Sequence, residues 1–287
     1  MKSILYLIIS IFISITLTSS VQKAPEGTKS VILQSIGNNV GSVSLNQSAG
    51  IISARLKLSD INSFEVKVLA DKGQIKIIFP DKTDISEIEA LLTSKGELAF
   101  YETYTQSEIT DLLKPDNQLI KLLNHDQEQI SSDPRVGCSS TENRKKADEY
   151  LQSAIPVSNC KLFWGIESKK SGYCLFALKT NKEGNPLIER SDVESVKIIN
   201  GKDSQDPKIQ IKLKPAAISV FADATKSNLN KAIAIVIDNQ VYSCPVVRNV
   251  IESGEIEVTG KFTVKEVNCF PAIFNSEQLP LSFKLLK

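Results

Sequence analysis

The sequence predicts an α+β fold, in which short strands and amphipathic helices follow one another along the chain. Apolar and polar residues alternate over several short runs bounded by turn residues, which is typical of half-buried strands. Two capping patterns, an Asp or Thr followed three residues later by Glu, each precede an apolar stripe of helical period. The composition, with 41% apolar and 23% charged residues, is that of a globular protein, and 287 residues suffice for two compact units or for one unit with a large insertion.

The N-terminus has the order of a secretory signal peptide. Lys2 precedes an apolar run over residues 4–17, and the small residues 18–20 follow it. The run is shorter than the roughly 20 residues that span a bilayer. We therefore expect residues 1–20 to be a signal peptide cleaved after Ser20, with an uncleaved N-terminal anchor as the alternative.

The charge balance argues against nucleic acid as a partner. Lys and Arg number 34 and Asp and Glu number 33, so the chain has no net field that would attract a polyanion. The sequence also contains no Walker loop and no dinucleotide-binding fingerprint. We therefore expect no nucleic acid and no cofactor.

Five cysteines leave the disulfide pattern open, and they are Cys138, Cys160, Cys174, Cys244 and Cys269. None are paired in Cys-x-x-Cys spacing, so a metal site is not indicated. In an exported protein one or two disulfides can form, and Cys160 with Cys174 or Cys138 are the nearest candidates in sequence. Buried free thiols that pack as small apolar side chains are the alternative.

The first elements form a compact succession. Residues 21–30 are polar and contain Pro and Gly, so we expect a linker there and a folded unit from about residue 31. Alternation over residues 64–68 and 74–79, with a turn between them, predicts a hairpin.

A helix and a strand follow this hairpin. Asp84 and Glu87 have capping-box spacing and open a helix that Gly96 closes, and residues 97–104 read as a strand. The resulting β-β-α-β succession is typical of a small open-faced sandwich.

The middle of the chain mixes helices with one hairpin. Residues 105–123 have a helical pattern interrupted by Pro115, and residues 140–151 are a second helix candidate. Residues 161–166 and 173–178 predict a hairpin in which Trp164 packs in the core.

The last third is the most strongly patterned. Strands are expected at residues 193–199, 208–213, 232–237, 240–242 and 255–258, and a helix starts near Pro215. Asp238 and Asn239 occupy a two-residue hairpin turn that requires positive φ. A second capping box, Thr263 with Glu266, opens a helix that Pro271 should kink or end.

This last third resembles the head subdomain of the SecD/SecDF protein-export family. The matching positions, in order, are Phe221, Thr225, Asn228, Ala-Ile-Val-Ile-Asp at 234–238, Ser-Cys-Pro at 243–245, Ile251, Gly254, Ile256, Gly260, Phe262, Thr263 and Leu279-Pro280. Upstream, residues 51–58, 77–80 and 96–104 resemble the base subdomain of the same first periplasmic domain. The segments 162–165, 175–179 and 186–187 look like the insertion that the Bacteroidetes type of SecDF carries.

The resemblance implies a ferredoxin-like base subdomain with an inserted α+β head subdomain. Residues 21–44 would then be a linker and the start of the folded unit, 45–104 the base, 105–189 the insertion, and 190–287 the head and the return to the base. It also implies a helix over residues 51–58. Asn239 stands where the family usually has Gly.

The function implied by the resemblance is binding without catalysis. Full-length members use the proton-motive force to help pull preproteins from the translocation channel, and their periplasmic head contacts the emerging chain. Since no later apolar stretch here has membrane-spanning length, we expect only the binding half of that activity. The expected partners are unfolded exported polypeptide or Sec translocase components, in the periplasm.

Four residues near the most family-like loop are the expected client contacts, and they are Phe221, Val246, Val247 and Ile251. Asp238, Pro245, Gly254 and Gly260 are expected to make turns or stop strands. Core packing is the alternative role for each of the four apolar side chains.

Two other functions remain open. A repurposed copy of the fold could act as a structural or assembly partner in the cell envelope. A hydrolase would need convergent polar groups near Asp238 or His125, the single histidine, but no nucleophile motif accompanies either residue. We therefore assign no catalytic, cofactor-binding or metal-binding residue.

Overall fold

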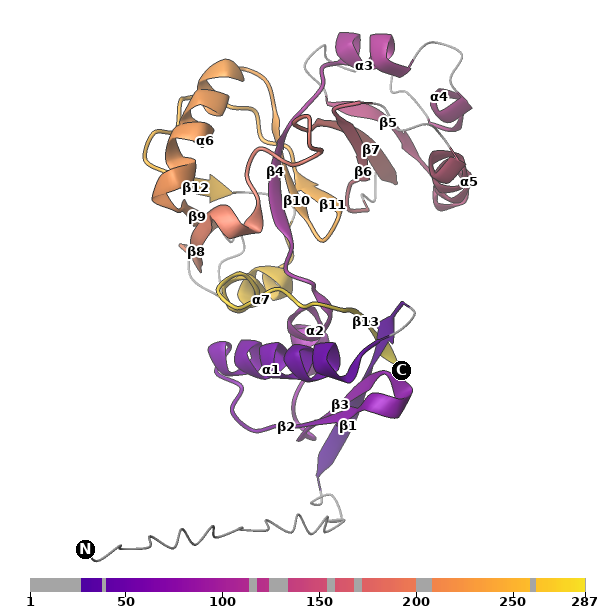
Figure 1. Cartoon of the computed structure of the whole chain (residues 1–287), viewed down its shortest axis with the longest axis vertical. Coiled ribbons are helices and arrows are strands. Elements are labelled where there is room, and N and C mark those ends of the chain that lie inside the picture. The colour runs from indigo at the N-terminus through magenta and orange to yellow at the C-terminus, as the bar shows by residue number, and fades with distance from the viewer. Residues whose placement is uncertain are drawn as a thin grey trace, which may run out of the picture.

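The computed structural model describes residues 27–37, 40–113, 118–123, 134–153, 158–167, 172–199, 208–258 and 262–286. Figure 1 shows a lower unit, which contains the first strand and the last, below two upper units that lie side by side. The mixture of helices with antiparallel sheets confirms the predicted α+β class. The signal-peptide prediction lies outside the described residues.

The lower unit is a four-stranded antiparallel sheet with two helices. Its strands lie in the order β13 (Ser282–Leu286), β1 (Thr28–Ile36), β3 (Gln74–Pro80) and β2 (Glu65–Leu69). The helices are α1 (Ser42–Leu58) and α2 (Ile85–Thr93), and a 3₁₀ turn, η1 (Ala70–Lys72), joins β2 to β3. This β-α-β-β-α-β succession is the ferredoxin-like base that the resemblance implies. The rest of the chain is inserted between α2 and β13.

The first strand, β1, begins inside the predicted linker. It starts at Thr28, whereas residues 21–30 were expected to connect the signal to the folded part. It pairs with both β3 and β13, and Ile32 lies opposite Lys76 on one side and Leu286 on the other. Its inward side chains, Val31 and Leu33, are buried. A half-polar strand of this kind becomes recognisable only through its two neighbours.

The strand expected over residues 97–104 forms, but the prediction that it completes the lower sheet is wrong. β4 (Leu98–Glu102) pairs with β10 (Ile233–Ile237), so that Phe100 lies opposite Ile235. The lower sheet receives β13 instead. The chain leaves the lower unit at Gly96, whose φ of +82° is in the left-handed region that glycine adopts without strain.

The upper unit that contains α6 has two short sheets (Figure 1). The first has the order β12 (Glu255–Val258), β9 (Ile209–Leu213) and β8 (Val193–Ile198), and the second has the order β11 (Gln240–Ser243), β10 and β4. Helix α6 (Pro215–Ser227) belongs to this unit, and a 3₁₀ turn, η2 (Arg190–Asp192), precedes β8 (Figure 1).

Helix α7 (Val264–Phe274) lies between the upper and lower units and contacts α1, α2 and β8. Pro271 does not end this helix, which continues for three more residues. The predicted capping box at its start is confirmed, because Thr263 and Glu266 bond reciprocally. At the start of α2, in contrast, Asp84 accepts from Ser86, while Glu87 pairs with Lys265 of α7. Glu87 thus pairs with another helix and does not make the reciprocal hydrogen bond that would complete a capping box.

The third unit corresponds to the middle of the chain. Its sheet has the order β5 (Arg135–Ser139), β7 (Tyr173–Lys179) and β6 (Cys160–Trp164), and its helices are α3 (Gln106–Leu113), α4 (Gln118–Leu122) and α5 (Thr141–Ser153). The predicted β6–β7 hairpin is confirmed, and Trp164 is buried with its indole N–H donating to Asp148 at 2.6 Å.

The disulfide joins Cys138 to Cys174, which lie opposite one another on β5 and β7. The nearest candidates in sequence, which involved Cys160, are therefore wrong, because strand register rather than sequence distance decides which thiols meet. Cys160, Cys244 and Cys269 are not part of a disulfide.

The second and third units share a closed arrangement of strands, here called the strand ring. β4 pairs with β10 and β10 with β11, while β6 pairs with β7. Single bridges complete the ring, from Gly165 after β6 to Val241 of β11 and from Thr103 after β4 to Leu178 of β7. Alternate residues of β10 therefore face two different cores, which explains its uninterrupted apolar sequence.

Candidate functional site

The structure gathers the four expected client-contact residues around one apolar pocket, here called the α6 pocket. Its volume is about 260 Å³. The lining residues come from α6, β4, β10, β12 and the loop after β11, and they are Phe100, Phe221, Thr225, Ile233, Ile235, Pro245, Val246, Val247, Arg248, Asn249, Ile251, Ile256 and Glu257. The four residues, which are up to thirty positions apart in the chain, thus line one pocket.

The four residues occupy different depths of this pocket. Phe221 is 2% exposed and forms the floor, where its ring meets that of Phe100 edge-to-face at 5.6 Å. Val247 and Ile251 are half-buried, and Val246 is 37% exposed at the mouth. Core packing therefore accounts for Phe221, whereas the other three present apolar surface that a partner can reach.

The loop over residues 245–251 forms the mouth of the α6 pocket and is held at both ends. At its start, Ile233 donates to the carbonyl of Pro245 at 3.1 Å and Val247 donates to that of Lys231 at 2.9 Å. At its end, the backbone N–H of Ile251 donates to the hydroxyl of Thr225 at 3.1 Å. Hydrogen bonds to β10 and the residues before it, and to α6, therefore hold the two ends of the loop.

Thr225 connects this loop to α6 through a fully buried side chain. Its hydroxyl accepts from Ile251 and donates to the carbonyl of Ala222 at 2.9 Å, so both of its functions are used. Sequence reasoning included Thr225 in the resemblance but gave it no role. Its spacing of four from Phe221 placed it on the buried face of α6, which was the available signal.

The expected turn residues divide into three groups. Asp238 and Asn239 have φ of +47° and +65°, and Gly254 has +69°, as their turns require. A methyl group at Gly254 would lie 2.6 Å from Ile218 of α6, so glycine is also needed there for close packing. Pro245 follows β11 and its carbonyl continues the pairing to Ile233. Gly260 lies outside the described residues.

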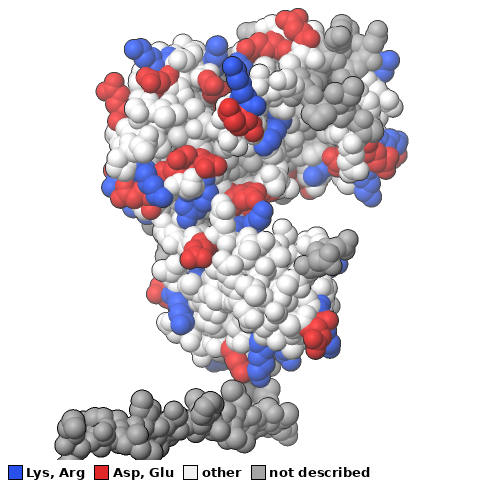
Figure 2. Space-filling view, viewed as in Figure 1, with Lys and Arg blue, Asp and Glu red and all other residues white. Residues whose placement is uncertain are grey.

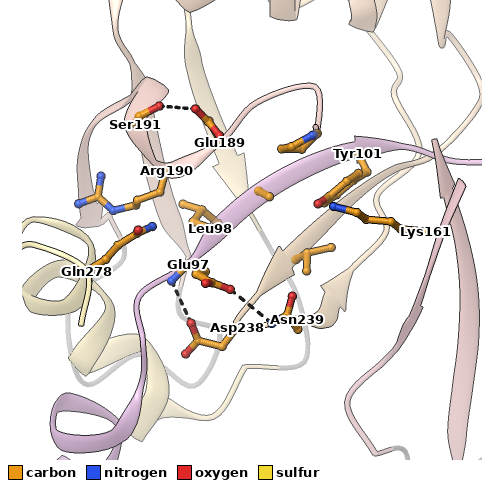
Figure 3. A pocket seen from close by; sticks show the side chains of 13 residues that line it. Glu97, Leu98, Tyr101, Lys161, Glu189, Arg190, Ser191, Asp238, Asn239 and Gln278 are labelled. Atoms are coloured by element: carbon orange, nitrogen blue, oxygen red, sulfur yellow. Dashed lines mark hydrogen bonds between the residues drawn. The ribbon is translucent and has the colours of Figure 1, made fainter. Parts of the chain in front are cut away.

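A second cavity, of about 400 Å³, lies beside the turn that contains Asp238 (Figure 3). Its lining residues come from the strand ring, η2 and the segment after α7, and they are Glu97, Leu98, Ala99, Tyr101, Lys161, Pro186, Glu189, Arg190, Ser191, Val236, Asp238, Asn239 and Gln278. This cavity is here called the ring pocket. Its wall is far more polar than that of the α6 pocket.

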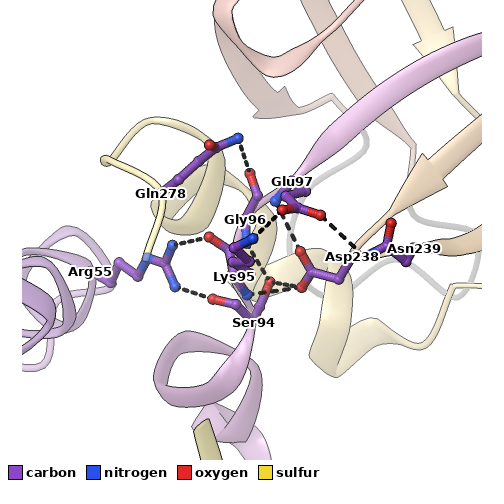
Figure 4. A network of polar contacts seen from close by, with 8 residues as sticks. All are labelled: Arg55, Ser94, Lys95, Gly96, Glu97, Asp238, Asn239 and Gln278. Atoms are coloured by element: carbon purple, nitrogen blue, oxygen red, sulfur yellow. Dashed lines mark hydrogen bonds and ion pairs between the residues drawn. The ribbon is translucent and has the colours of Figure 1, made fainter. Parts of the chain in front are cut away.

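Asp238 connects the upper sheet to the segment that leaves the lower unit (Figure 4). Its carboxylate accepts from the backbone N–H groups of Lys95 and Glu97 at 3.0 and 2.9 Å and from the Ser94 hydroxyl at 2.6 Å. Three donors satisfy this carboxylate, so it has the partners of a structural group rather than of a free general base.

Arg55 holds the other side of the same segment. Its guanidinium is fully buried and donates to the carbonyls of Ser94 and Lys95 (Figure 4). It also donates to the Glu277 carbonyl and to the Ser276 hydroxyl. Burial lowers the pKa of Arg55 to about 10, although Asp238 opposes this shift, so the group is still charged at neutral pH. Sequence reasoning missed this residue, yet an arginine in the apolar stripe of α1 was a visible signal.

Among the residues that the structure describes, no three potential metal-ligating side chains come together, and no helix has the length and apolar character needed to cross a membrane. His125 lies outside the described residues. On the face in Figure 2, acidic and basic side chains are interspersed, which agrees with the balanced composition.

One family model matches the last third of the chain and part of the third unit. Residues 176–281 match the family model for the SecDF P1 head subdomain. This segment contains α6, β10 to β12 and α7, and therefore the whole α6 pocket except Phe100.

Curated relatives extend the similarity on both sides. The protein translocase subunit SecD of Calditerrivibrio nitroreducens is 38% identical over 146 residues, which are 51% of this chain and 28% of that protein. The protein translocase subunit SecDF of Brucella abortus is 22% identical over 249 residues, 87% of this chain and 27% of that protein. The chain thus spans little more than a quarter of the length of these relatives.

Solved structures show the same fold. A crystal structure of SecDF in a super-membrane-facing form matches 91% of this chain and 30% of that chain, with a TM-score of 0.52 and 17% identity. A structure described as a SecDF membrane component that enhances protein export matches 90% of this chain and 98% of that chain, with a TM-score of 0.50 and 17% identity. The resemblance to the first periplasmic domain of SecD and SecDF is thereby confirmed.

Proposed function

We propose that this protein is a binding module of protein export, which contacts unfolded exported chains through the α6 pocket and has no catalytic activity of its own. The observation that supports this proposal most is the gathering of Val246, Val247 and Ile251 around one apolar mouth above the Phe221 ring. Similarity to SecD and SecDF translocase subunits supports the export context and a periplasmic location.

The α6 pocket has the properties that a binder of unfolded chains needs. Its size suits one apolar side chain at a time, and burying a large aliphatic or aromatic side chain contributes roughly 1.5–3 kcal/mol. Three further apolar side chains from α6 and the adjoining loops are exposed, namely Val220, Leu229 and Val250. Such surface is sequence-tolerant, because it recognises apolar character rather than a particular motif.

A fluorescence titration tests the proposal. The chain from residue 21 onward is titrated with a labelled, unfolded preprotein and, separately, with the same polypeptide folded. We expect saturable micromolar binding to the unfolded form and at least roughly tenfold weaker binding to the folded form, because folding hides the apolar side chains that the pocket takes up. Binding to neither form would contradict the proposal and favour a structural or assembly role in the cell envelope.

A further inference from the structure

One edge of the β12–β9–β8 sheet lies open beside the α6 pocket. Among the described residues β12 pairs with β9 alone, and no single bridge reaches its other side. The opposite edge, β8, is closed by a side chain, because the amide of Asn275 accepts from the backbone N–H of Val196 at 2.9 Å and donates to its carbonyl at 2.8 Å. Of the two edges of this sheet, β12 is therefore the one that remains available to a further strand.

The hydrogen-bond ladder shows which backbone groups of β12 face outward. Leu213 of β9 donates to the carbonyl of Gly254 at 2.9 Å, so these two residues form a hydrogen-bonded pair. Such pairs alternate along an antiparallel ladder, so the N–H and C=O groups of Glu255 and Glu257 point away from β9. The Glu255 N–H donates to the Ser253 hydroxyl at 3.2 Å. The Glu257 N–H is left as an outward donor of β12 that has no acceptor among the described residues.

The α6 pocket reaches this open edge. Neighbouring side chains of a strand point to opposite faces of its sheet, and Ile256 is buried while Glu257 is exposed. Both residues nevertheless line the pocket, which therefore extends along the margin of β12 rather than under one face alone. A strand laid against β12 would have alternate side chains on the face of Ile256, and these side chains would point into the pocket.

The charges at this edge argue against an ionic ligand and against a second copy of the chain. The pocket is lined by one cation, Arg248, and one anion, Glu257, so it carries no excess charge of either sign. Antiparallel pairing of two β12 strands centred on Ile256 would place Glu255 of one copy opposite Glu257 of the other, and like charges directly opposite one another destabilise a sheet. A short edge with two exposed carboxylates thus opposes self-association and suits a different polypeptide.

We propose that the α6 pocket takes its client as an extended segment that adds to β12 as an antiparallel strand, in keeping with the antiparallel pairing of the rest of this sheet. The backbone of the segment bonds to the outward N–H and C=O groups of Glu257, and an aliphatic side chain next to that contact enters the pocket above Phe221. The inference rests on the proposed function, since it states how the same site holds an unfolded chain. Main-chain hydrogen bonds are common to all polypeptides, so this mode accepts clients of varied sequence.

Amide hydrogen exchange of the purified chain with a short peptide tests this mode. The probe is a soluble peptide of alternating Thr and Ser with one central Leu, blocked at both ends. At saturating peptide we expect exchange of the Glu257 amide to slow at least about tenfold, because its N–H gains an acceptor. The Val196 amide, which Asn275 already holds, is the matched control and should be unchanged.

Two substitutions at position 257 separate the backbone from the side chain. Glu257→Pro removes the outward N–H, which an edge strand tolerates, and should weaken peptide binding at least about fivefold. Glu257→Ala keeps the N–H and removes the carboxylate, and it should bind within about twofold of the wild type. Urea unfolding of both variants checks that each is folded, and the exchange experiment on the wild type does not depend on either.

The outcomes distinguish this inference from the proposed function. Peptide binding with unchanged exchange at Glu257, or equal affinity of Glu257→Pro and Glu257→Ala, would overturn strand addition and leave the α6 pocket as a site for side chains alone. Binding of neither the peptide nor an unfolded preprotein would contradict the proposed function itself, and strand addition with it.

Discussion

The carboxylate of Asp238 accepts a hydrogen bond from the backbone N–H of Glu97 at 2.9 Å, although the two residues are 141 positions apart in the chain. The turn at Asp238 needs only a residue that tolerates positive φ, which Asn or Gly would also satisfy. The additional donors, Lys95 and Ser94, show why a carboxylate is present. The turn therefore fixes the upper sheet to the exit from the lower unit.

Replacing this acceptor should destabilise the fold without changing its shape. Asp238→Asn retains the size of the side chain but turns an N–H₂ group toward a backbone donor, and we expect a loss of about 1–3 kcal/mol in the free energy of unfolding. Urea unfolding measures the loss. The matched control is Asp223→Asn, at an exposed position of α6, which should change stability by less than about 0.5 kcal/mol. Equal losses at both positions would contradict a special role for Asp238.

Replacing Arg55, which holds the other side of the segment over residues 94–97, should reduce the free energy of unfolding more than replacing Asp238. Arg55→Met leaves the carbonyls of Ser94, Lys95 and Glu277 without their donor, and we expect a loss of at least about 3 kcal/mol. Arg55→Lys, which restores a charge but not the planar fork, should be intermediate. Lys57→Met, exposed on the same helix, is the control, and denaturant unfolding is the measurement. A wild-type midpoint for Arg55→Met would refute this account of the junction.

Thr225 should control the mouth of the α6 pocket. Thr225→Val keeps the shape and removes the acceptor for the Ile251 N–H, so hydrogen exchange of that amide should quicken by about tenfold, while Thr225→Ser should restore it. Thr93→Val is the matched control, since Thr93 donates to a helix carbonyl at 2.9 Å but holds no loop. Unchanged exchange at Ile251 in Thr225→Val would show that the loop is held by its other end.

Much of this architecture follows from residue patterns, and the exceptions have physical causes. The β10–β11 turn, the Thr263 capping box and the β6–β7 hairpin are local, so short sequence windows predicted them. β1 and the sheet membership of β4 depend on partners far along the chain, which alternation cannot identify. The same limit applied to the disulfide, where register decided the pairing.

The candidate site was predictable to a similar degree. The residues around the α6 pocket cluster because the loop after β11 folds back on β10, and both lie within the patterned last third. The ring pocket was not anticipated, since its walls are brought together by single bridges between two units that lie far apart in the sequence.

The ion pair between Glu108 and Lys179 predicts a specific pH dependence. Partial burial alone would raise the pKa of Glu108, but hydrogen bonds from Lys179 and Thr105 outweigh it and lower the pKa to about 2. A carboxylate whose pKa is lowered by folding stabilises the folded state fully when the pH is above the pKa of the unfolded state, near 4.3. This contribution is lost as the pH falls through the pKa of the folded state, about 2.

Glu108→Gln should therefore reduce stability at pH 7 and lose its effect in acid. Because the pair is partly exposed, we expect a difference of about 0.2–1 kcal/mol at pH 7 that shrinks between pH 4.3 and 2. Urea midpoints of the wild type and Glu108→Gln over this range provide the measurement. Glu142→Gln, in a more exposed pair with Lys146, is the control and should show a smaller difference. A gap at pH 2 as large as at pH 7 would be inconsistent with this mechanism.

The disulfide should stabilise the third unit. Joining Cys138 to Cys174 closes a loop with a sequence separation of 36, for which chain entropy predicts about 3–4 kcal/mol. The double variant Cys138→Ser/Cys174→Ser should lower the unfolding midpoint by a corresponding amount, and reduction of the wild type should have the same effect. Cys160→Ser, at a free and half-buried thiol, should change it much less. An unfolding midpoint that does not change on reduction would contradict this prediction and would mean that the β5–β7 pairing alone stabilises the third unit.

The most direct test of the central claim is preprotein binding by two valine variants of similar exposure. Val246, at the mouth of the α6 pocket, is 37% exposed, and Val264, at the start of α7 and outside the pocket, is 40% exposed. Titrated with a labelled unfolded preprotein, Val246→Lys should bind at least about tenfold more weakly than the wild type, because a charge at the mouth opposes entry of an apolar side chain. Val264→Lys should bind like the wild type. Equal affinity of Val246→Lys and the wild type would contradict the assignment of this pocket.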